Sequence, residues 1–149
     1  MGTVASIIVR KGESSDYPVL IGIDAYAMAH QERATAIAEG LAKGESLVAL
    51  SEGELVGYAL MANTFFGNAF LSALVVSPRH RRKGIALALL AAAKSQCTTP
   101  KLFTSANSTN TAAIALFLRA GFVPSGTVEN LDPGDPELIY FAERSNNDL

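Results

Sequence analysis

Cysteine and histidine are almost missing from this 149-residue sequence, which contains one Cys and two His. The lone Cys97 excludes an intrachain disulfide, and two histidines without a companion cluster argue against a structural zinc site. Long apolar runs are missing too: the longest, Ile85 to Ala93, is far shorter than the roughly 20 residues that span a bilayer. We therefore expect a soluble, cytoplasmic protein with no metal and no membrane partner.

Charged residues are also few, at 17%, whereas hydrophobic residues make up 49% of the chain. A chain of this size and composition can bury a substantial core and is not of the disordered class. No linker, repeat or low-complexity tract divides it, so we expect a single domain over residues 1–149.

Carboxylates are absent from the middle of the chain. All 14 acidic residues lie within 13–54 or 129–148, so residues 55–128 have none and carry a charge of +7, against −9 for the two flanks together. The basic residues of this middle stretch are Arg79, Arg81, Arg82, Lys83, Lys94, Lys101 and Arg119. Nearby carboxylates would repel phosphates, so the pattern indicates a bound polyanion. Four bases in one loop form a point-like site, not a stripe along a duplex, which disfavours nucleic acid.

Apolar periodicity and turn residues predict the order β-α-α-β-β-β-α-β-α-β-β. The expected strands are 6–10, 46–51, 54–61, 69–76, 101–105, 123–128 and 137–142, and the expected helices are 16–29, 30–43, 84–96 and 109–119. Residues 63–68 are expected to form a loop. This order is typical of a mixed α/β sheet with helices on both faces.

The stretch from Leu74 to Ala86, LVVSPRHRRKGIA, predicts an anion site. A buried strand ends at Val76, a basic turn follows, and a helix begins near Gly84. The first N–H groups of a helix have no intrahelical acceptor, and the helix dipole favours negative charge there. Gly84 and the small Ala86 would let a phosphate approach the backbone closely. Neither the P-loop pattern nor the full dinucleotide fingerprint is present.

This stretch resembles motif A of the GNAT acetyltransferase superfamily, Arg/Gln-x-x-Gly-x-Gly/Ala, filled here by Arg81, Gly84 and Ala86. In that family the loop amides bind the pyrophosphate of coenzyme A. Residues 101–122 resemble the second family signature, in which a strand, an Asn and a helix are followed by Gly-Phe. Asn110 falls on the family Asn, which either caps the helix, contacts the ligand, or does both.

The resemblance extends from about residue 6 to residue 142, and its tail, residues 125–137, is similar to that of a bacterial subgroup. It implies the GNAT fold, with a mixed, mostly antiparallel sheet flanked by helices on both faces, and acetyl-CoA as co-substrate. The residues that it implies for coenzyme A binding are Val75, Val76, Arg81, Arg82, Lys83, Gly84, Ile85, Ala86, Asn107, Asn110 and Phe117.

No catalytic residue can be assigned from the sequence. Phe117 stands where many members carry a Tyr that protonates the leaving thiolate, and Phe has no proton to donate. The two strands on which many members carry a basic Glu have Ser72-Ala73 and Thr104-Ser105 instead. The sources left open for a base are Glu32, Glu39, Glu129, Asp132, Asp135, Glu137, Tyr140, His30, His80 and a water held by Ser72.

In GNAT folds the first two helices, the loop after the third strand and the last two strands form the acceptor pocket. The resemblance therefore implies a pocket that includes Tyr26, His30, Phe65, Phe66 and Tyr140. The acidic flanks favour a cationic acceptor, such as the amine of a small molecule or a peptide. The leading hypothesis is an acetyl-CoA-dependent N-acetyltransferase. A non-catalytic acyl-CoA-binding module and a nucleic-acid-binding domain are the alternatives, and a homodimer is left open.

Overall fold

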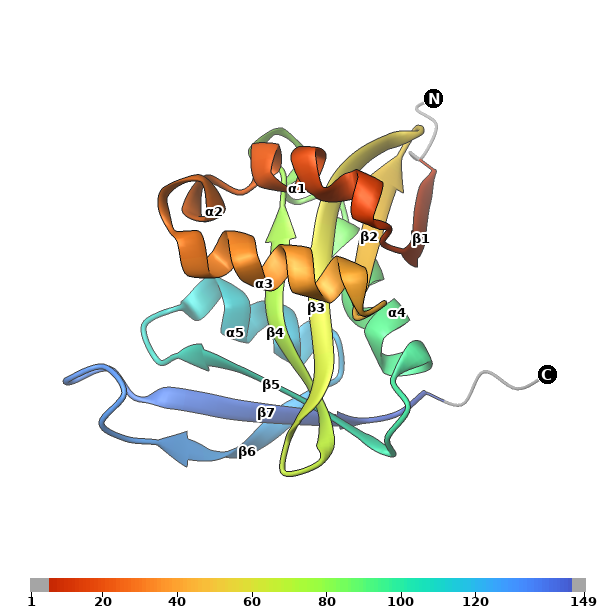
Figure 1. Ribbon diagram of the computed structural model, residues 1–149. Helices are drawn as coiled ribbons and strands as arrows, with labels where there is room; N and C mark the ends of the chain where they lie inside the picture. Colours follow the sequence, from red (N-terminus) through yellow and green to blue (C-terminus); the bar gives the residue numbers. More distant parts are fainter. Residues whose placement is uncertain (1–5, 146–149) are drawn as a thin grey trace.

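A computed structural model describes residues 6–145, so the ends of the expected domain, 1–5 and 146–149, lie outside the described residues. One seven-stranded sheet runs through the molecule in the order β1-β2-β3-β4-β5-β7-β6 (Figure 1). The strands are β1 (Ile7–Lys11), β2 (Ser46–Ser51), β3 (Glu54–Phe65), β4 (Asn68–Val76), β5 (Lys101–Asn107), β6 (Val123–Val128) and β7 (Glu137–Glu143). Every pairing is antiparallel except that of β4 with β5. The predicted mixed, mostly antiparallel sheet is confirmed.

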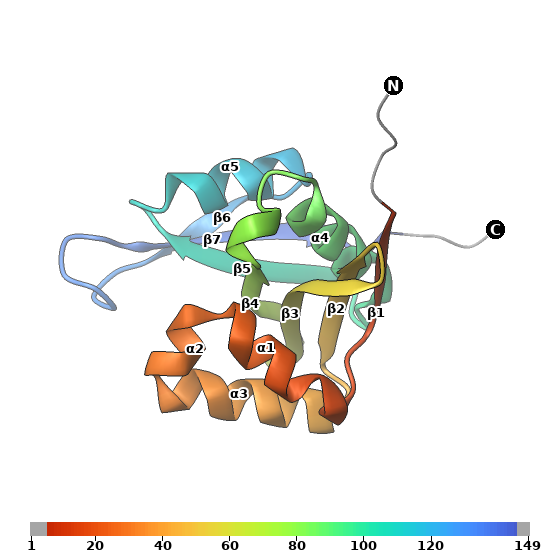
Figure 2. The same ribbon diagram turned by 90° about the horizontal axis from the view of Figure 1, so that it is seen from above.

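Helices cover both faces of the sheet, as predicted. Figure 2 shows α4 (Ile85–Gln96) and α5 (Thr111–Arg119) on one side, and α1 (Tyr17–Ile23), α2 (Ala25–Ala29) and α3 (Gln31–Ala42) on the other. Side chains of β3 pack into both cores: Val56 and Ala59 toward α4, and Tyr58 and Leu60 toward α1 and α3. Val56 joins the α4 side because the pairing with β2 shifts there, Ala49 lying opposite Gly57 and Leu50 opposite Leu55. Gly57 lets α4 lie close to the sheet, because a Cβ there would be 3.2 Å from Ile85 Cγ2.

The prediction of a single helix over residues 16–29 is wrong, because two helices, α1 and α2, occupy this range. Asp24, with φ −117° and ψ 95°, separates α1 from α2. Its Oδ1 accepts hydrogen bonds from the backbone N–H of Tyr26 at 3.0 Å and of Ala27 at 3.2 Å, so it caps α2. The apolar spacing that suggested one helix continues through this cap.

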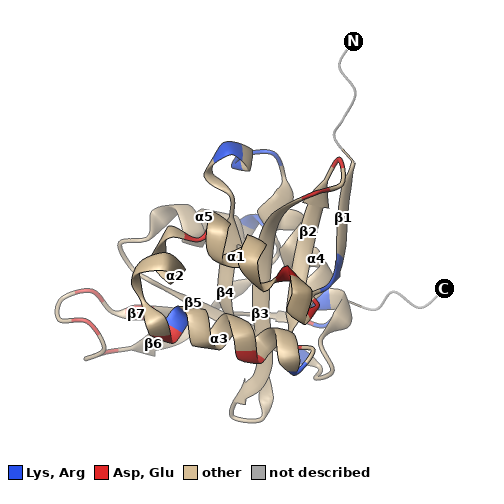
Figure 3. Cartoon of the chain, turned by 45° about the horizontal axis from the view of Figure 1, so that its top comes forward, with Lys and Arg blue, Asp and Glu red and all other residues tan. Residues whose placement is uncertain are grey.

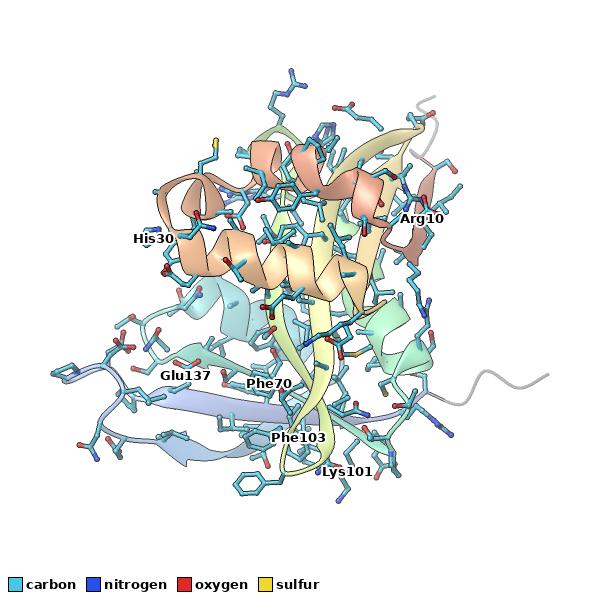
Figure 4. The ribbon with its side chains drawn as sticks, in the orientation of Figure 1. Arg10, His30, Phe70, Lys101, Phe103 and Glu137 are labelled. Atoms are coloured by element: carbon cyan, nitrogen blue, oxygen red, sulfur yellow. The ribbon has the colours of Figure 1, made fainter. Side chains whose placement is uncertain are left out.

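The loop expected over residues 63–68 is also wrong, because β3 continues to Phe65 and β4 already begins at Asn68. Aromatic packing stabilises this long hairpin: the Phe65 ring lies 5.4 Å from that of Phe70 and 4.8 Å from that of Phe103. The ring centroid of Phe103 in turn lies 5.8 Å from that of Phe141. Phe70 and Phe103 lie on the part of the sheet that α1–α3 leave uncovered (Figure 4). The other predicted elements are present, with ends shifted by one or two residues.

Candidate functional site

The main cleft of the molecule opens where two neighbouring strands separate. Only residues 69–71 of β4 pair with β5, where their partners are residues 102–104. Beyond these pairs, residues 72–76 of β4 and 105–107 of β5 diverge. The resulting cleft, of about 1280 Å³, extends between these strand ends, the beginnings of α4 and α5, and the junction of α1 with α2. Because β4 and β5 are not paired with each other here, backbone groups on their facing edges can bind an extended ligand.

A β-bulge at Ser72 marks the point of separation. Leu60 pairs with Ala73 and Met61 with Leu71, so no residue of β3 lies opposite Ser72. The bulge reverses the direction of the side chains that follow, because Ala73 and Val75 then pack toward α1 and α3. Ser72 itself lines the cleft.

The loop from Ser77 to Gly84 forms one end of the cleft and contains a group of basic residues, coloured blue in Figure 3. Arg82 and Gly84 both have positive φ, of 63° and 85°. Such alternation directs successive N–H groups toward one concavity, which suits an anion. Gly84 precedes the first residue of α4, and a Cβ at Gly84 would meet no atom within 4 Å, so the space beside it is open.

Most of the residues predicted to bind coenzyme A meet in this one cleft, although they come from β4, α4, β5, α5 and two loops. Those that line it are Val75, Val76, Arg81, Arg82, Gly84, Ile85, Ala86, Asn107, Asn110 and Phe117. Lys83 lies in the same loop, with an exposed side chain, but does not line the cleft. Their contact with coenzyme A stays a prediction.

Three of these residues also have structural roles. Asn110 caps α5, since its Oδ1 accepts a hydrogen bond from Ala113 N–H at 3.2 Å. The Nδ2 of Asn107 donates to Asp132 Oδ2 at 2.8 Å and to the carbonyl oxygen of Asp135 at 3.1 Å, which holds the turn between β6 and β7. Phe117 is 4% exposed, and its ring packs 5.7 Å from that of Tyr140.

Two carboxylates line the cleft, Asp24 and Glu137. Asp24 is 4% exposed and lies in a buried polar cluster. Its Oδ2 accepts hydrogen bonds from Tyr58 Oη at 2.5 Å and from Arg33 Nη1 at 3.0 Å. Burial raises the pKa of Tyr58, and the hydrogen bond to Asp24 raises it further, so the phenol stays protonated. Sequence reasoning missed Asp24 and Arg33, although an Asp ahead of a short Ala-rich segment is itself a capping signal.

Glu137 begins β7 on the other side of the cleft. Ser105 Oγ, on β5, donates a hydrogen bond to its Oε2 at 2.6 Å. Of the residues considered as a source of a base, Glu137, Ser72 and His80 line the cleft, whereas the other acids, His30 and Tyr140 do not. Of the residues expected in the acceptor pocket, Tyr26 lines the cleft but Phe65 and Phe66 do not.

No group of three or more His, Cys, Asp or Glu side chains within residues 6–145 is placed to hold a metal ion. In the same range, no helix has the length and apolar character that crossing a membrane requires.

A mostly antiparallel sheet that opens between two parallel strands, with a basic loop and a helix N-terminus at the opening, defines the GNAT class of acetyltransferase. The family model described as acetyltransferase (GNAT) family matches residues 10–122, and the chain belongs to this family. A comparison with curated proteins finds no match.

Solved structures agree with this assignment. A GNAT-family acetyltransferase from Bacillus cereus ATCC 10987 is 32% identical, with a TM-score of 0.89 over 95% of this chain and 99% of that one. The yncA protein of Salmonella typhimurium, solved with acetyl-CoA, is 18% identical, with a TM-score of 0.73 over 93% of this chain and 94% of its own. The ribosomal-protein-S18-alanine N-acetyltransferase of Escherichia coli is 18% identical, with a TM-score of 0.72 over 97% and 99%. The last two show likeness of fold.

Proposed function

We propose that residues 1–149 form a single N-acetyltransferase domain that transfers the acetyl group of acetyl-CoA to an amine of a small molecule or a peptide. The observation that carries the proposal is the cleft between the separated ends of β4 and β5, with the basic loop and the first turn of α4 at one end. We place the enzyme in the cytoplasm, as a monomer or a homodimer.

The residues at this end of the cleft suit coenzyme A. Backbone N–H groups of Gly84, Ile85 and Ala86 would bind the pyrophosphate, and the exposed Arg81 and Arg82 would add charge-assisted hydrogen bonds. The open space beside Gly84 leaves room for the phosphates.

The pantetheine arm would follow the edge of β4 that β5 leaves open, at Val75 and Val76, and reach the amide of Asn110. The Nδ2 group of Asn110 makes no hydrogen bond with a residue that the structure describes, so it can donate to this arm while Oδ1 caps α5. When bound, acetyl-CoA supplies an acyl group on a thiol leaving group.

The acceptor would enter from the opposite side of the cleft, between Tyr26 on α2 and Glu137 on β7. A negative carboxylate at this end favours a cationic amine. Support for a peptide amine comes from the fold shared with the ribosomal-protein-S18-alanine N-acetyltransferase of Escherichia coli.

A non-catalytic acyl-CoA-binding module remains the second candidate, because Phe117 lines the cleft without a proton to donate. Thiol release from acetyl-CoA, measured across a panel of amines together with calorimetric binding of coenzyme A, separates the two. We expect binding and turnover, both abolished by Gly84→Glu, which would fill the open space beside the loop. Tight binding without turnover on any amine would identify the module instead.

A further inference from the structure

The two carboxylates of the cleft differ in how far their hydrogen-bonding capacity is used. Asp24 accepts four hydrogen bonds, from the N–H groups of Tyr26 and Ala27, from Tyr58 Oη and from Arg33 Nη1. A carboxylate has about four acceptor positions, so Asp24 has none left. Its charge is paired with that of Arg33 at 3.0 Å. This residue therefore has a structural role.

Glu137 has acceptor capacity to spare. It is partly exposed, and within the described residues its side chain accepts one hydrogen bond, from Ser105 Oγ, and forms no ion pair. Figure 4 shows it on the same face of the sheet as α1–α3, on the part that these helices leave uncovered. A partly buried carboxylate without a counter-ion attracts a cation.

The partner of Glu137 fixes its place relative to the opening. Ser105 follows Thr104, which is the last residue of β5 paired with β4. On the adjacent strand Ser105 lies directly opposite Ile139, so Glu137 is its diagonal neighbour, within reach of a long side chain. The carboxylate of Glu137 is therefore held beside the point where the pairing of β4 with β5 ends and the cleft begins.

The other charged groups around the cleft are already engaged or lie at its other end. Arg33 is paired with Asp24. Asp135 accepts hydrogen bonds from Ser108 and Thr109, and Asp132 from Asn107. The remaining basic side chains of the cleft lie at its opposite end, toward the basic loop and the end of α5; they are His80, Arg81, Arg82 and Arg119.

We propose that Glu137, oriented by Ser105, is the acceptor site: its carboxylate binds the ammonium group of a primary amine and removes one of its protons. The inference rests on the proposed function. The amine nitrogen then forms a bond with the acyl carbon while the carbon–sulfur bond breaks. The second proton of the nitrogen goes to the departing thiolate, and Glu137 releases the first to solvent.

This site also defines the class of acceptor. A primary ammonium offers three N–H donors to a carboxylate, whereas a carboxylate next to the amino group would be repelled by Glu137. We therefore expect phenethylamine, spermidine, ethanolamine and a tripeptide amide with uncharged side chains to be better acceptors than free alanine or glutamate. Free amino acids acetylated as fast as the best amine would overturn this assignment of the class.

The test compares Glu137→Gln with Glu143→Gln, a matched control on the same strand. Glu143 lies at the far end of β7, opposite Lys101. Loss of a general base lowers the rate by about 10²–10⁴-fold, so kcat/KM for the fastest amine of the panel should fall by that factor at pH 7 in Glu137→Gln only. Coenzyme A should bind both variants as it binds the parent protein. In calorimetry with coenzyme A present, the same amine should bind more weakly to Glu137→Gln.

The dependence of the rate on pH separates proton removal from a purely structural role. In Glu137→Gln only amine that is already neutral can react, and that fraction rises tenfold per pH unit below the amine pKa, about 10 for an alkylamine. The deficit of the variant should therefore shrink as the pH rises. A deficit that is constant with pH, or a value within threefold of the parent at pH 7, would overturn the proposal.

Ser105 is tested as a positioning residue. Ser105→Ala should lower kcat and leave coenzyme A binding unchanged, and Ser105→Thr, which keeps the hydroxyl, should restore most of the activity. If the parent protein acetylates no amine, the proposed function itself fails. If the parent is active and both Glu137→Gln and Ser105→Ala retain full activity, only the acceptor site is wrong.

Discussion

Tyr58 on β3 and Asp24 between α1 and α2 are joined by a hydrogen bond of 2.5 Å across 34 positions of sequence. Together with Arg33 they bind the helical layer to the sheet beneath the cleft. Both side chains are buried, and Asp24 accepts the hydrogen bond that the buried hydroxyl of Tyr58 donates.

Tyr58→Phe should lower the free energy of unfolding by about 1–3 kcal/mol, because Asp24 then loses a buried donor. Arg33→Met should cost more, about 3–5 kcal/mol, since it leaves a buried charge unpaired. Urea denaturation measures both. Tyr17→Phe is the matched control, because its hydroxyl makes no hydrogen bond within the described residues, and a loss as large as that of Tyr58→Phe would contradict this account.

Gly84 is tested by a pair of glycines with nearly the same backbone. Gly84 has a φ of 85° and Gly53, in the turn between β2 and β3, a φ of 81°, and an added Cβ would meet no atom within 4 Å at either position. Replacement by Ala should therefore cost each about 1–2 kcal/mol of stability from left-handed strain. Only Gly84→Ala should also weaken coenzyme A binding, measured by calorimetry. Equal weakening by Gly53→Ala would show that strain alone is responsible.

Arg81 supplies charge at the end of the cleft that we assign to the phosphates. A hydrogen bond to a charged group contributes about 1.5–3 kcal/mol, so Arg81→Ala should weaken coenzyme A binding by about 10- to 150-fold. The difference from the parent protein should become smaller with added salt. Lys43→Ala, an exposed base just after α3, serves as the control and should bind coenzyme A as the parent does.

The contribution of Asp16 to the stability of the protein depends on pH in the acid range. Arg10 donates two hydrogen bonds to its carboxylate, at 2.9 Å and 3.1 Å, and these lower the pKa of Asp16 below its usual value of 3.8. A carboxyl group with a lowered folded-state pKa stabilises the protein above its unfolded pKa, and this contribution is lost as the pH falls through the folded value. Asp16→Asn should therefore lose stability at pH 6 but converge on the parent below pH 3.8, in thermal melts across this range. Parallel curves would exclude a titrating pair.

Much of the fold was predictable because local signals agreed with the tertiary structure. Val-rich strands, the Glu52-Gly53 turn and the Gly121 that ends α5 predicted elements within one or two residues of their observed ends. The cap at Asp24 was missed because apolar spacing continues across it. The extension of β3 to Phe65 was missed because Asn63 and Thr64 are polar, and ring packing with Phe70 and Phe103 decides the conformation there.

The candidate site was likewise predictable only where its residues lie close together in the sequence. The loop around Gly84 could be predicted because its chemistry lies within one short stretch of sequence. The bulge at Ser72 and the hydrogen bond from Ser105 to Glu137 could not, since both depend on how distant strands are paired. Sequence alone therefore left Glu137 as one of many carboxylates outside the acid-free middle.

The short parallel pairing of β4 with β5 links the protein's resistance to unfolding to what it binds. The pairing stops at Leu71 and Thr104, so the strand residues beyond them make no backbone hydrogen bonds between β4 and β5. Each such hydrogen bond would stabilise the fold by about 1 kcal/mol. A ligand bound between the two strands would take the place of this missing pairing. Its binding energy is then added to the folding free energy by mass action, about 2.7 kcal/mol at a hundredfold excess over Kd. The melting temperature and the resistance to proteases would therefore rise with the fraction of the protein that has ligand bound.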